Sequence, residues 1–395
     1  MSRAASLTSW SSALIACIVG FGGTIALIVQ ATQALGATPS QTSSAVTALC
    51  LGIALAGIVL TLWLKMPVVL AWSTPGAALL AAVAPGLSWP QAVGAFIVAA
   101  LFMVLVGLIP ALGRLAQQIP SSLASAMLAG VLLPFAIALF RSVEIDPVPA
   151  IVLLGVFIMA HQRLPLYSVL LVLVAGIGLV VLRGDIAALP SADLVGGMDF
   201  VRPVFDPAVI VSIAVPLFLV TLISQNLPGL VVLKAAGFEP PAGPVILGNG
   251  LASLVLAPFG AHGINLAAIT AAICIGDDTH GPRAMRWKAG MVYGLLYLLL
   301  AAFTPFVVAV FLMMPKAVIA SLTGIAVLMP LAAVTEKMLT DHHERDAAIL
   351  TFAATASGVT LLGVGSAFWG LVIGFAALGA KKLLRAKGRD GRGGI

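Results

Sequence analysis

Charged side chains are scarce in this sequence: 9% of its 395 residues are Asp, Glu, Lys or Arg, whereas 61% are hydrophobic. Soluble domains carry about 25% charged residues, so this composition excludes an ordinary soluble protein. Long apolar runs recur along the whole chain, and they lack the alternation of a transmembrane β-strand. The sequence therefore predicts an all-α polytopic membrane protein embedded in a lipid bilayer.

Cysteine is also rare, and Cys17, Cys50 and Cys274 lie far apart in apolar runs. This spacing excludes a disulfide framework and a thiolate metal site. The stretch 276–288, GDDTHGPRAMRWK, has an Asp-Asp-x-His grouping, but no ligand cluster accompanies it. We expect it to be a solvated cytoplasmic loop, and we expect neither a metal nor another cofactor. The basic residues flank apolar runs, which argues against a nucleic acid partner.

The apolar runs predict fourteen membrane segments. They are residues 11–34, 42–64, 67–85, 91–113, 119–140, 147–161, 165–182, 208–233, 243–258, 261–276, 286–313, 316–337, 346–363 and 366–386. The first is longer than a signal-peptide core and many others follow it, so we expect a retained helix. Segments 67–85 and 261–276 are short, because a regular spanning helix takes about 20 residues.

The distribution of basic residues supports this number of segments. With the amino terminus inside, sixteen of the twenty Lys and Arg residues face the cytoplasm. The other four are Arg141, Arg183, Arg202 and Lys316. Omitting either short segment would invert every later loop and destroy the positive-inside asymmetry. Both segments therefore count as crossings, and both chain termini are expected in the cytoplasm.

The two halves of the chain resemble each other at three places in the same order. The matched pairs are QALGATP (33–39) with KAAGFEP (234–240), AWSTPGAALLAAVAPG (71–86) with AHGINLAAITAAICIG (261–276), and PSSLASAMLAGVLLP (120–134) with PKAVIASLTGIAVLMP (315–330). Each half holds seven segments, an odd number, so the second half must be inverted relative to the first.

This repeat divides the chain into four parts. We expect a first repeat over residues 1–183, an extracytoplasmic linker over 184–207, a second repeat over 208–386 and a basic cytoplasmic tail over 387–395.

Segments 3 and 10 each have helix-breaking residues near their start. Pro75 and Gly76 lie in the first, and Gly260 and Gly263 lie in the second. Irregular backbone at membrane depth is tolerated only inside protein or beside a cavity. Each segment is therefore predicted to be a short extended stretch followed by a half-helix. The two helix starts would face each other near the midplane, where their positive dipole ends favour an anion.

Several stretches carry a resemblance to a known family. AWSTPGAALL, SQNLPG, GAHGINLAAITAAICIG and MPKAVIASLTGIA resemble the bacterial benzoate:proton symporter family (BenE type), and the similarity runs over essentially the whole chain. The chain is more distantly similar to uracil and xanthine (nucleobase) permeases. The resemblance implies a core domain of segments 1–4 and 8–11, a gate domain of segments 5–7 and 12–14, and substrate between the two short strands. It also implies a possible homodimer through the gate domain.

The sequence departs from the nucleobase permeases at their acidic positions. Gln225 and Asn226 replace the Glu-His pair of segment 8, and His262 and Gly263 replace the Glu-Asn pair of segment 10. A buried carboxylate would repel an anionic substrate, whereas amides and a histidine would not. The departure favours a carboxylate substrate over a nucleobase.

His262 is the predicted proton-coupling residue, because a histidine is the natural titrating group at membrane depth. The alternative is a neutral histidine that holds the junction between strand and helix by a hydrogen bond. Gln225 and Asn226 are predicted to donate hydrogen bonds to a carboxylate, or else to join helices. Asn265 is expected either to bind substrate or to cap the half-helix, and Gly263 lies beside it.

The other half-helix begins at Trp72, Ser73 and Thr74. Ser73 and Thr74 are expected to cap it while leaving backbone amides for an anion, and Trp72 either stacks on an aromatic ring or packs. The glycines Gly20, Gly22 and Gly23 of segment 1 are expected to admit a ligand or to allow close helix packing, the commoner use.

Together these features predict a secondary active transporter of a bacterial inner membrane. It would import benzoate or a similar aromatic carboxylate with protons. The first alternative is a nucleobase or inorganic-anion transporter of the same fold. An intramembrane enzyme would need a convergent catalytic set, and His262 stands alone, so we do not expect an enzyme. A receptor without transport activity is a further alternative.

Overall fold

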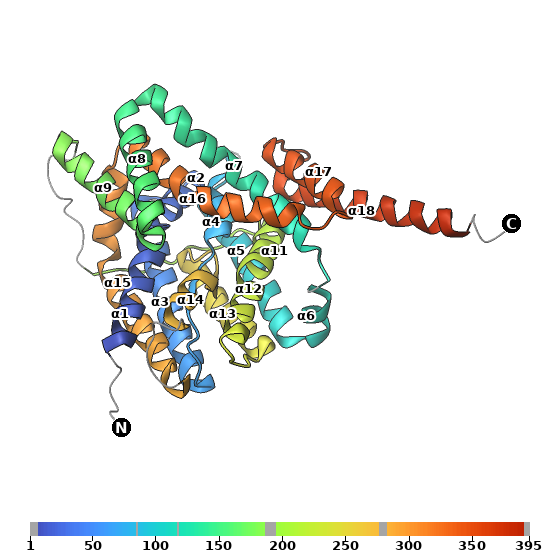
Figure 1. Cartoon of the computed structure of the whole chain (residues 1–395), viewed down its shortest axis with the longest axis horizontal. Coiled ribbons are helices and arrows are strands. Elements are labelled where there is room, and N and C mark those ends of the chain that lie inside the picture. Colours follow the sequence, from blue (N-terminus) through green and yellow to red (C-terminus); the bar gives the residue numbers. More distant parts are fainter. Residues whose placement is uncertain (1–6, 84–85, 117, 186–194, 276–282, 391–395) are drawn as a thin grey trace.

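The computed structural model describes residues 7–83, 86–116, 118–185, 195–275 and 283–390, and it is mostly helical (Figure 1). Ten helices among these described residues are long and apolar enough to cross a membrane. The helix α8 (Pro147–Arg163) is apolar but shorter. The prediction of a polytopic α-helical membrane protein is confirmed.

The helices pack in two groups. The first group contains α1 (Leu7–Gly22), α2 (Ile25–Ala34), α3 (Pro39–Leu64), α4 (Thr74–Ala81), α5 (Trp89–Leu108), α6 (Pro110–Ala116), α10 (Pro207–Val209), η2 (Ile210–Ala214), α11 (Val215–Thr221), η3 (Leu222–Asn226), α12 (Leu227–Ala235), α13 (Ala242–Leu256), α14 (Ala268–Ile275) and α15 (Trp287–Met313). Within it, α3 packs along α15 and α5 packs along α13.

The second group contains α7 (Ser121–Ile145), α8, α9 (Ser168–Arg183), α16 (Lys316–Leu339), α17 (Arg345–Ala356) and α18 (Ser366–Asp390). Here α7 packs along α16 and α17, and α8 packs along α9. In Figure 1, α9, α8, α7, α17 and α18 follow the upper edge of the molecule, above the first group. α18 extends through residue 390, so the first part of the predicted basic tail is helical.

A two-stranded antiparallel ribbon lies inside the first group. Strand β1 (Leu70–Trp72) pairs with β2 (Ile264–Leu266), with Ala71 opposite Asn265 at the centre. The pairing continues at both ends, where Ser73 N donates to Gly263 O (3.1 Å) and Ala267 N donates to Val69 O (3.1 Å).

Each strand leads into an eight-residue helix, α4 after β1 and α14 after β2. Because the strands are antiparallel, the two helices leave from opposite ends of the ribbon with their amino ends toward it. The predicted stretch-plus-half-helix in segments 3 and 10 is confirmed.

The register of the sequence match between these segments is wrong. The match pairs Trp72 with His262, but β1 ends at Trp72 whereas β2 ends four residues later, at Leu266. Four residues are about one helical turn, so the shift still pairs small residues on one helix face, such as Ala77 with Ala271, although fewer residues are identical. Asn265 therefore belongs to a strand and not to the first turn of the half-helix. The second segment needs the extra residues because the chain turns at Gly260, whose φ is +99°.

The turns after α2 and α12 have the same geometry. Gly36 and Gly237 have φ of +77° and +78°. In each turn the next residue donates back to a carbonyl five positions earlier, Ala37 N to Thr32 O and Phe238 N to Leu233 O, both at 3.0 Å. This is the glycine-terminated helix end called the Schellman motif. The match between residues 33–39 and 234–240 thus corresponds to one shared local structure.

The helix that precedes each turn is interrupted and holds one strand. The first breaks between α1 and α2, where Thr24 Oγ1 accepts a hydrogen bond from Trp72 Nε1 of β1 (2.8 Å). The second contains the π-helical turn η3, where Asn226 Oδ1 accepts from Leu266 N of β2 (3.1 Å). At each interruption a polar side chain accepts a hydrogen bond from a donor of the ribbon.

Replacing Asn226 by Leu should destabilise the protein. Asn226 is fully buried, and its Oδ1 also accepts from Asn249 Nδ2 (2.9 Å). The substitution leaves Leu266 N and Asn249 Nδ2 without an acceptor, which lowers the free energy of unfolding by about 1–3 kcal/mol for each donor. Thermal unfolding in detergent is the measurement. Gln225→Leu, the same change on a neighbouring side chain without a hydrogen bond in the described chain, is the control. Equal unfolding midpoints for the two variants would contradict this role.

Candidate functional site

His262 joins the two short segments at the ribbon. Its Nε2 lies 3.1 Å from the carbonyl oxygen of Ser73. A carbonyl only accepts, so Nε2 carries the proton and Nδ1 is the unprotonated nitrogen of the neutral ring. The side chain is 5% exposed, and its ring lies edge-on to Phe96 with centroids 6.3 Å apart. A second proton can bind at Nδ1 without loss of the bond to Ser73.

This position agrees with both interpretations of His262. The histidine holds the strand–helix junction, as the alternative expectation stated, and it keeps one nitrogen for a further proton. Proton coupling by His262 therefore stays a prediction.

Ser73 caps α4, as predicted. Its Oγ accepts from Gly76 N (3.1 Å) and shares a hydrogen bond with Thr221 Oγ1 (2.8 Å). Thr74, the first residue of α4, is half-buried, and its hydroxyl makes no hydrogen bond within the described chain. Sequence reasoning missed Thr221. The available signal was its place one turn before Gln225 on the same broken helix.

Gly263 leaves space at this point. A methyl group added at its Cα would touch only Ser73 Cβ at 3.7 Å and Thr221 Oγ1 at 3.9 Å. The amino end of α4, two hydroxyls and a histidine thus meet beside Gly263, where a methyl group would fit, and no acidic side chain is among them. Helix amino ends and hydroxyl donors stabilise anions, so this arrangement suits a carboxylate.

Gln225 and Asn226 have different environments. Asn226 is fully buried and holds β2, so the alternative expectation, a structural role, is the one observed. Gln225 is half-buried, and its amide has no hydrogen-bond partner in the described chain. Only Gln225 of this pair keeps donors for a ligand.

Trp72 and Asn265 are packing residues in this structure. The Trp72 ring is 2% exposed and lies against Phe21 and Tyr297, with centroids 5.3 and 6.3 Å away. A stacking contact with substrate has no room here, because these rings already enclose the indole. Asn265 is fully buried in β2, and its Nδ2 donates to Leu266 O (2.8 Å). It does not cap α14, because that helix begins at Ala268 and the residue before it is Ala267.

The glycines of segment 1 serve close packing. A side chain at Gly20 would collide with Thr270, and one at Gly22 would meet Leu173 of α9. Gly23 is similarly close to its own helix backbone at Val19. The commoner of the two expected uses is therefore the observed one.

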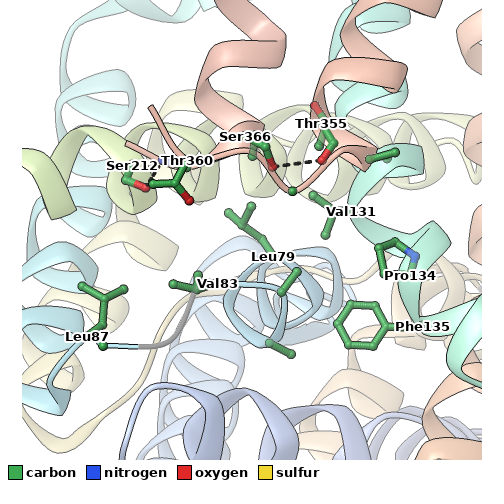
Figure 2. Close-up of a pocket in the computed structure, with 18 of the residues that line it drawn as sticks. Leu79, Val83, Leu87, Val131, Pro134, Phe135, Ser212, Thr355, Thr360 and Ser366 are labelled. Atoms are coloured by element: carbon green, nitrogen blue, oxygen red, sulfur yellow. Dashed lines mark hydrogen bonds between the residues drawn. The ribbon is translucent and has the colours of Figure 1, made fainter. Parts of the chain in front are cut away.

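Two cavities touch the broken helix that runs from α10 to α12, one at its start and one near its middle. One of about 600 Å³ touches Val209 and Ser212 at its start, and Figure 2 shows it in close-up. The other, of about 470 Å³, touches Leu222 and Leu227 and includes Arg114. Neither is lined by residues of the ribbon or by Gly263.

No group of three His, Cys, Asp or Glu side chains comes together among the residues that the structure describes. The Asp-Asp-x-His grouping falls within residues 276–282, outside the described residues.

Comparison with solved structures shows a shared fold. The transmembrane domain of a cyanobacterium bicarbonate transporter, BicA, is similar with a TM-score of 0.62 at 16% identity, over 93% of this chain and 97% of that one. The murine Solute Carrier 26 family member A9 anion transporter, in the inward-facing state, is similar with a TM-score of 0.65 at 10% identity, over 98% of this chain and 69% of that one. At these identities the similarity concerns the fold alone.

Sequence comparison identifies the family. The family model described as benzoate membrane transport protein matches residues 4–380. The inner membrane protein YdcO of Escherichia coli (strain K12) is 40% identical over 360 residues, which cover 91% of this chain and 92% of that protein. The benzoate membrane transport protein of Acinetobacter baylyi (strain ATCC 33305 / BD413 / ADP1) is 35% identical over 372 residues, 94% of each chain. This chain therefore belongs to the benzoate membrane transport protein family, whose members are transporters and not enzymes.

Proposed function

We propose that the protein is a secondary active transporter that imports benzoate or a related aromatic carboxylate together with protons. One observation carries the proposal: His262 bonds to the cap of α4 beside the Ser73 and Thr221 hydroxyls, with room for a methyl group at Gly263 and no acidic group among these residues. One relative is named an inner membrane protein and another a benzoate membrane transport protein. Both names support benzoate transport by this chain in a bacterial inner membrane.

The architecture of this proposal is a fourteen-segment, seven-plus-seven inverted repeat. Three pairs of features support it: two glycine-ended turns of the same geometry, two strands that pair at the centre, and two interrupted helices that each hold a strand. The repeats would be residues 1–183 and 208–386, joined by 184–207, and residues 387–395 would form a cytoplasmic tail.

The two groups of helices would then have different tasks. In this proposal the first group is the core that carries the substrate, and the second group is the gate against which it moves. The gate would also form the contact of a homodimer. Both termini would lie in the cytoplasm, so the end where α4 finishes and α10 begins would be extracytoplasmic.

The carboxylate would bind at the amino end of α4. Pro75 has no N–H, so the free donor of the first turn is Thr74 N, next to the hydroxyls of Ser73 and Thr221. The Gln225 amide would add a donor, and the aromatic ring would lie toward the space beside Gly263. The helix dipole and these donors together replace the water lost by the anion.

His262 would couple the proton to this anion. A proton at Nδ1 turns the ring into an imidazolium, which strengthens carboxylate binding, and the bound anion in turn favours the proton by the same amount. Anion and proton would enter together from the acidic side and leave together at the higher cytoplasmic pH.

A second candidate is an inorganic-anion transporter. The fold shared with a bicarbonate transporter and with an SLC26 anion transporter favours it, since such folds bind small anions. Neither comparison with solved structures gives comparable support to a nucleobase substrate.

Competition for uptake tests the substrate class. Purified protein in proteoliposomes should accumulate labelled benzoate under an imposed pH gradient, and unlabelled aromatic carboxylates should displace it. Uracil and xanthine should not, because the site has anion donors but no carboxylate for a nucleobase, and bicarbonate should not, because it lacks the aromatic ring. Displacement by bicarbonate at similar concentration would favour the second candidate, and displacement by uracil or xanthine would contradict selectivity for carboxylates.

Replacing His262 by Gln tests the coupling. Glutamine keeps a donor for Ser73 O but cannot titrate, so benzoate binding should partly persist while accumulation driven by a pH gradient is abolished. His161→Gln in α8, outside the ribbon, is the matched control and should accumulate benzoate normally. Full gradient-driven accumulation by His262→Gln would mean that another group, or the substrate itself, carries the proton.

Thr221→Val tests the hydroxyl that sequence reasoning missed. The change is nearly isosteric and removes one donor, so the KM for benzoate should rise about five- to tenfold. Thr32→Val is the control, because the Thr32 hydroxyl bonds only to its own helix at Val29 O. An unchanged KM in Thr221→Val would remove Thr221 from the binding site.

A further inference from the structure

The smaller of the two cavities lies among α5, α6, α12 and α13, in the lower part of the first group in Figure 1. Its volume is about 470 Å³, within the usual range for small-molecule sites. In the proposed orientation it lies on the cytoplasmic side, because it includes Arg114 of α6 and the amino end of α13, the helix that follows Lys234. The proposed function does not yet use this cavity.

Arg114 is the only charged or polar side chain among the described residues that line the cavity. It is exposed, and it makes no ion pair or hydrogen bond within the described chain. The other lining residues are glycine, alanine, proline, valine, leucine or isoleucine. A single unpaired cation in an apolar wall is complementary to a ligand with one negative charge and an apolar body.

The apolar wall is accessible to such a ligand. Pro110 is exposed, and Leu227 and Pro241 are half-buried. An aromatic ring that packs against these side chains leaves water, which is favourable in proportion to the apolar area buried. An inorganic anion has no apolar body to place there. The wall therefore favours an aromatic carboxylate over a small inorganic anion.

The amino end of α13 lines the same cavity. Its N-cap residue, Pro241, makes no capping hydrogen bond, and Pro244 has no N–H. The N–H groups of Ala242 and Gly243 have no acceptor within the described chain. Free donors at a helix amino end stabilise a carboxylate, so they reinforce the charge of Arg114.

The cavity also touches the helix that carries Gln225. Leu222 is the first residue of η3 and Leu227 follows η3 directly, and both line the cavity. Gln225 lies between them in the chain, and its amide is a proposed donor to the substrate. The cavity and the proposed substrate site thus share one structural element.

We propose that this cavity is an exit site, which holds the aromatic carboxylate after it leaves the ribbon and before it enters the cytoplasm. The inference rests on the proposed function and on its orientation. The carboxylate pairs with the Arg114 guanidinium, and the ring packs against Leu227 and Pro241. Because Arg114 is exposed, salt screens this attraction, and the anion is released to the cytoplasm.

Removing the charge of Arg114 tests the exit site. Labelled benzoate transport is measured in inside-out and in right-side-out membrane vesicles, so that benzoate meets either the cytoplasmic or the outer face. On the cytoplasmic face the KM of Arg114→Gln should rise about five- to tenfold, because one charge-assisted bond is lost. On the outer face its KM should equal that of wild type, which also shows that the variant is folded. Arg114→Lys keeps the charge and should keep most of the affinity.

Arg163→Gln is the matched control. Arg163 is also exposed in the last turn of its helix, α8, and does not line the cavity, so both KM values should stay unchanged. Gly113→Leu is a second variant that leaves Arg114 intact. A Cβ at Gly113 would contact only Val106 O, at 3.6 Å, so the larger side chain has room and fills part of the cavity. It should also raise the KM on the cytoplasmic face.

The two faces separate the possible results. Equal cytoplasmic KM values for wild type, Arg114→Gln and Gly113→Leu overturn the exit site and leave the proposed transport standing. A rise on the outer face, alone or to the same extent on both faces, also overturns it. Competition by acetate as strong as that by unlabelled benzoate on the cytoplasmic face overturns recognition of the ring. Absence of benzoate transport in wild type overturns the proposed function, and the exit site with it.

Discussion

An unpaired backbone N–H or C=O costs several kcal/mol in hydrocarbon, so a chain that leaves the helical conformation at membrane depth must find other partners. Here two extended segments satisfy that requirement by pairing with each other as β1 and β2. The strands are only three residues long, so most of their remaining polar groups need side chains from surrounding helices. The rest of the first group is arranged around this requirement.

Several buried polar side chains are explained by that need alone. Asn226 accepts from Leu266 N, and Ser253 Oγ accepts from Ile264 N (2.9 Å). Thr24 in turn fixes Trp72. Polar residues in membrane segments are often taken as functional, but here the ribbon uses several of them. Near the α4 cap, Gln225, Nδ1 of His262 and Thr74 N keep hydrogen-bonding capacity, and Asn265 Oδ1 in β2 is also without a partner in the described chain.

The ribbon also gathers positive potential at one place. Both half-helices direct their amino ends to it, so an anion is stabilised there.

The sequence by itself determined the class, the interrupted segments and the residues at the α4 cap, because hydropathy, breaking residues and capping chemistry are local. It did not determine the register between the segments, since identities among alanines in two helices do not report where each strand ends. Nor did it separate Asn226 from Gln225, or assign Trp72 to packing and Asn265 to a strand. Only the tertiary structure decided those roles, because they depend on which distant groups occupy each side chain's hydrogen bonds and surface.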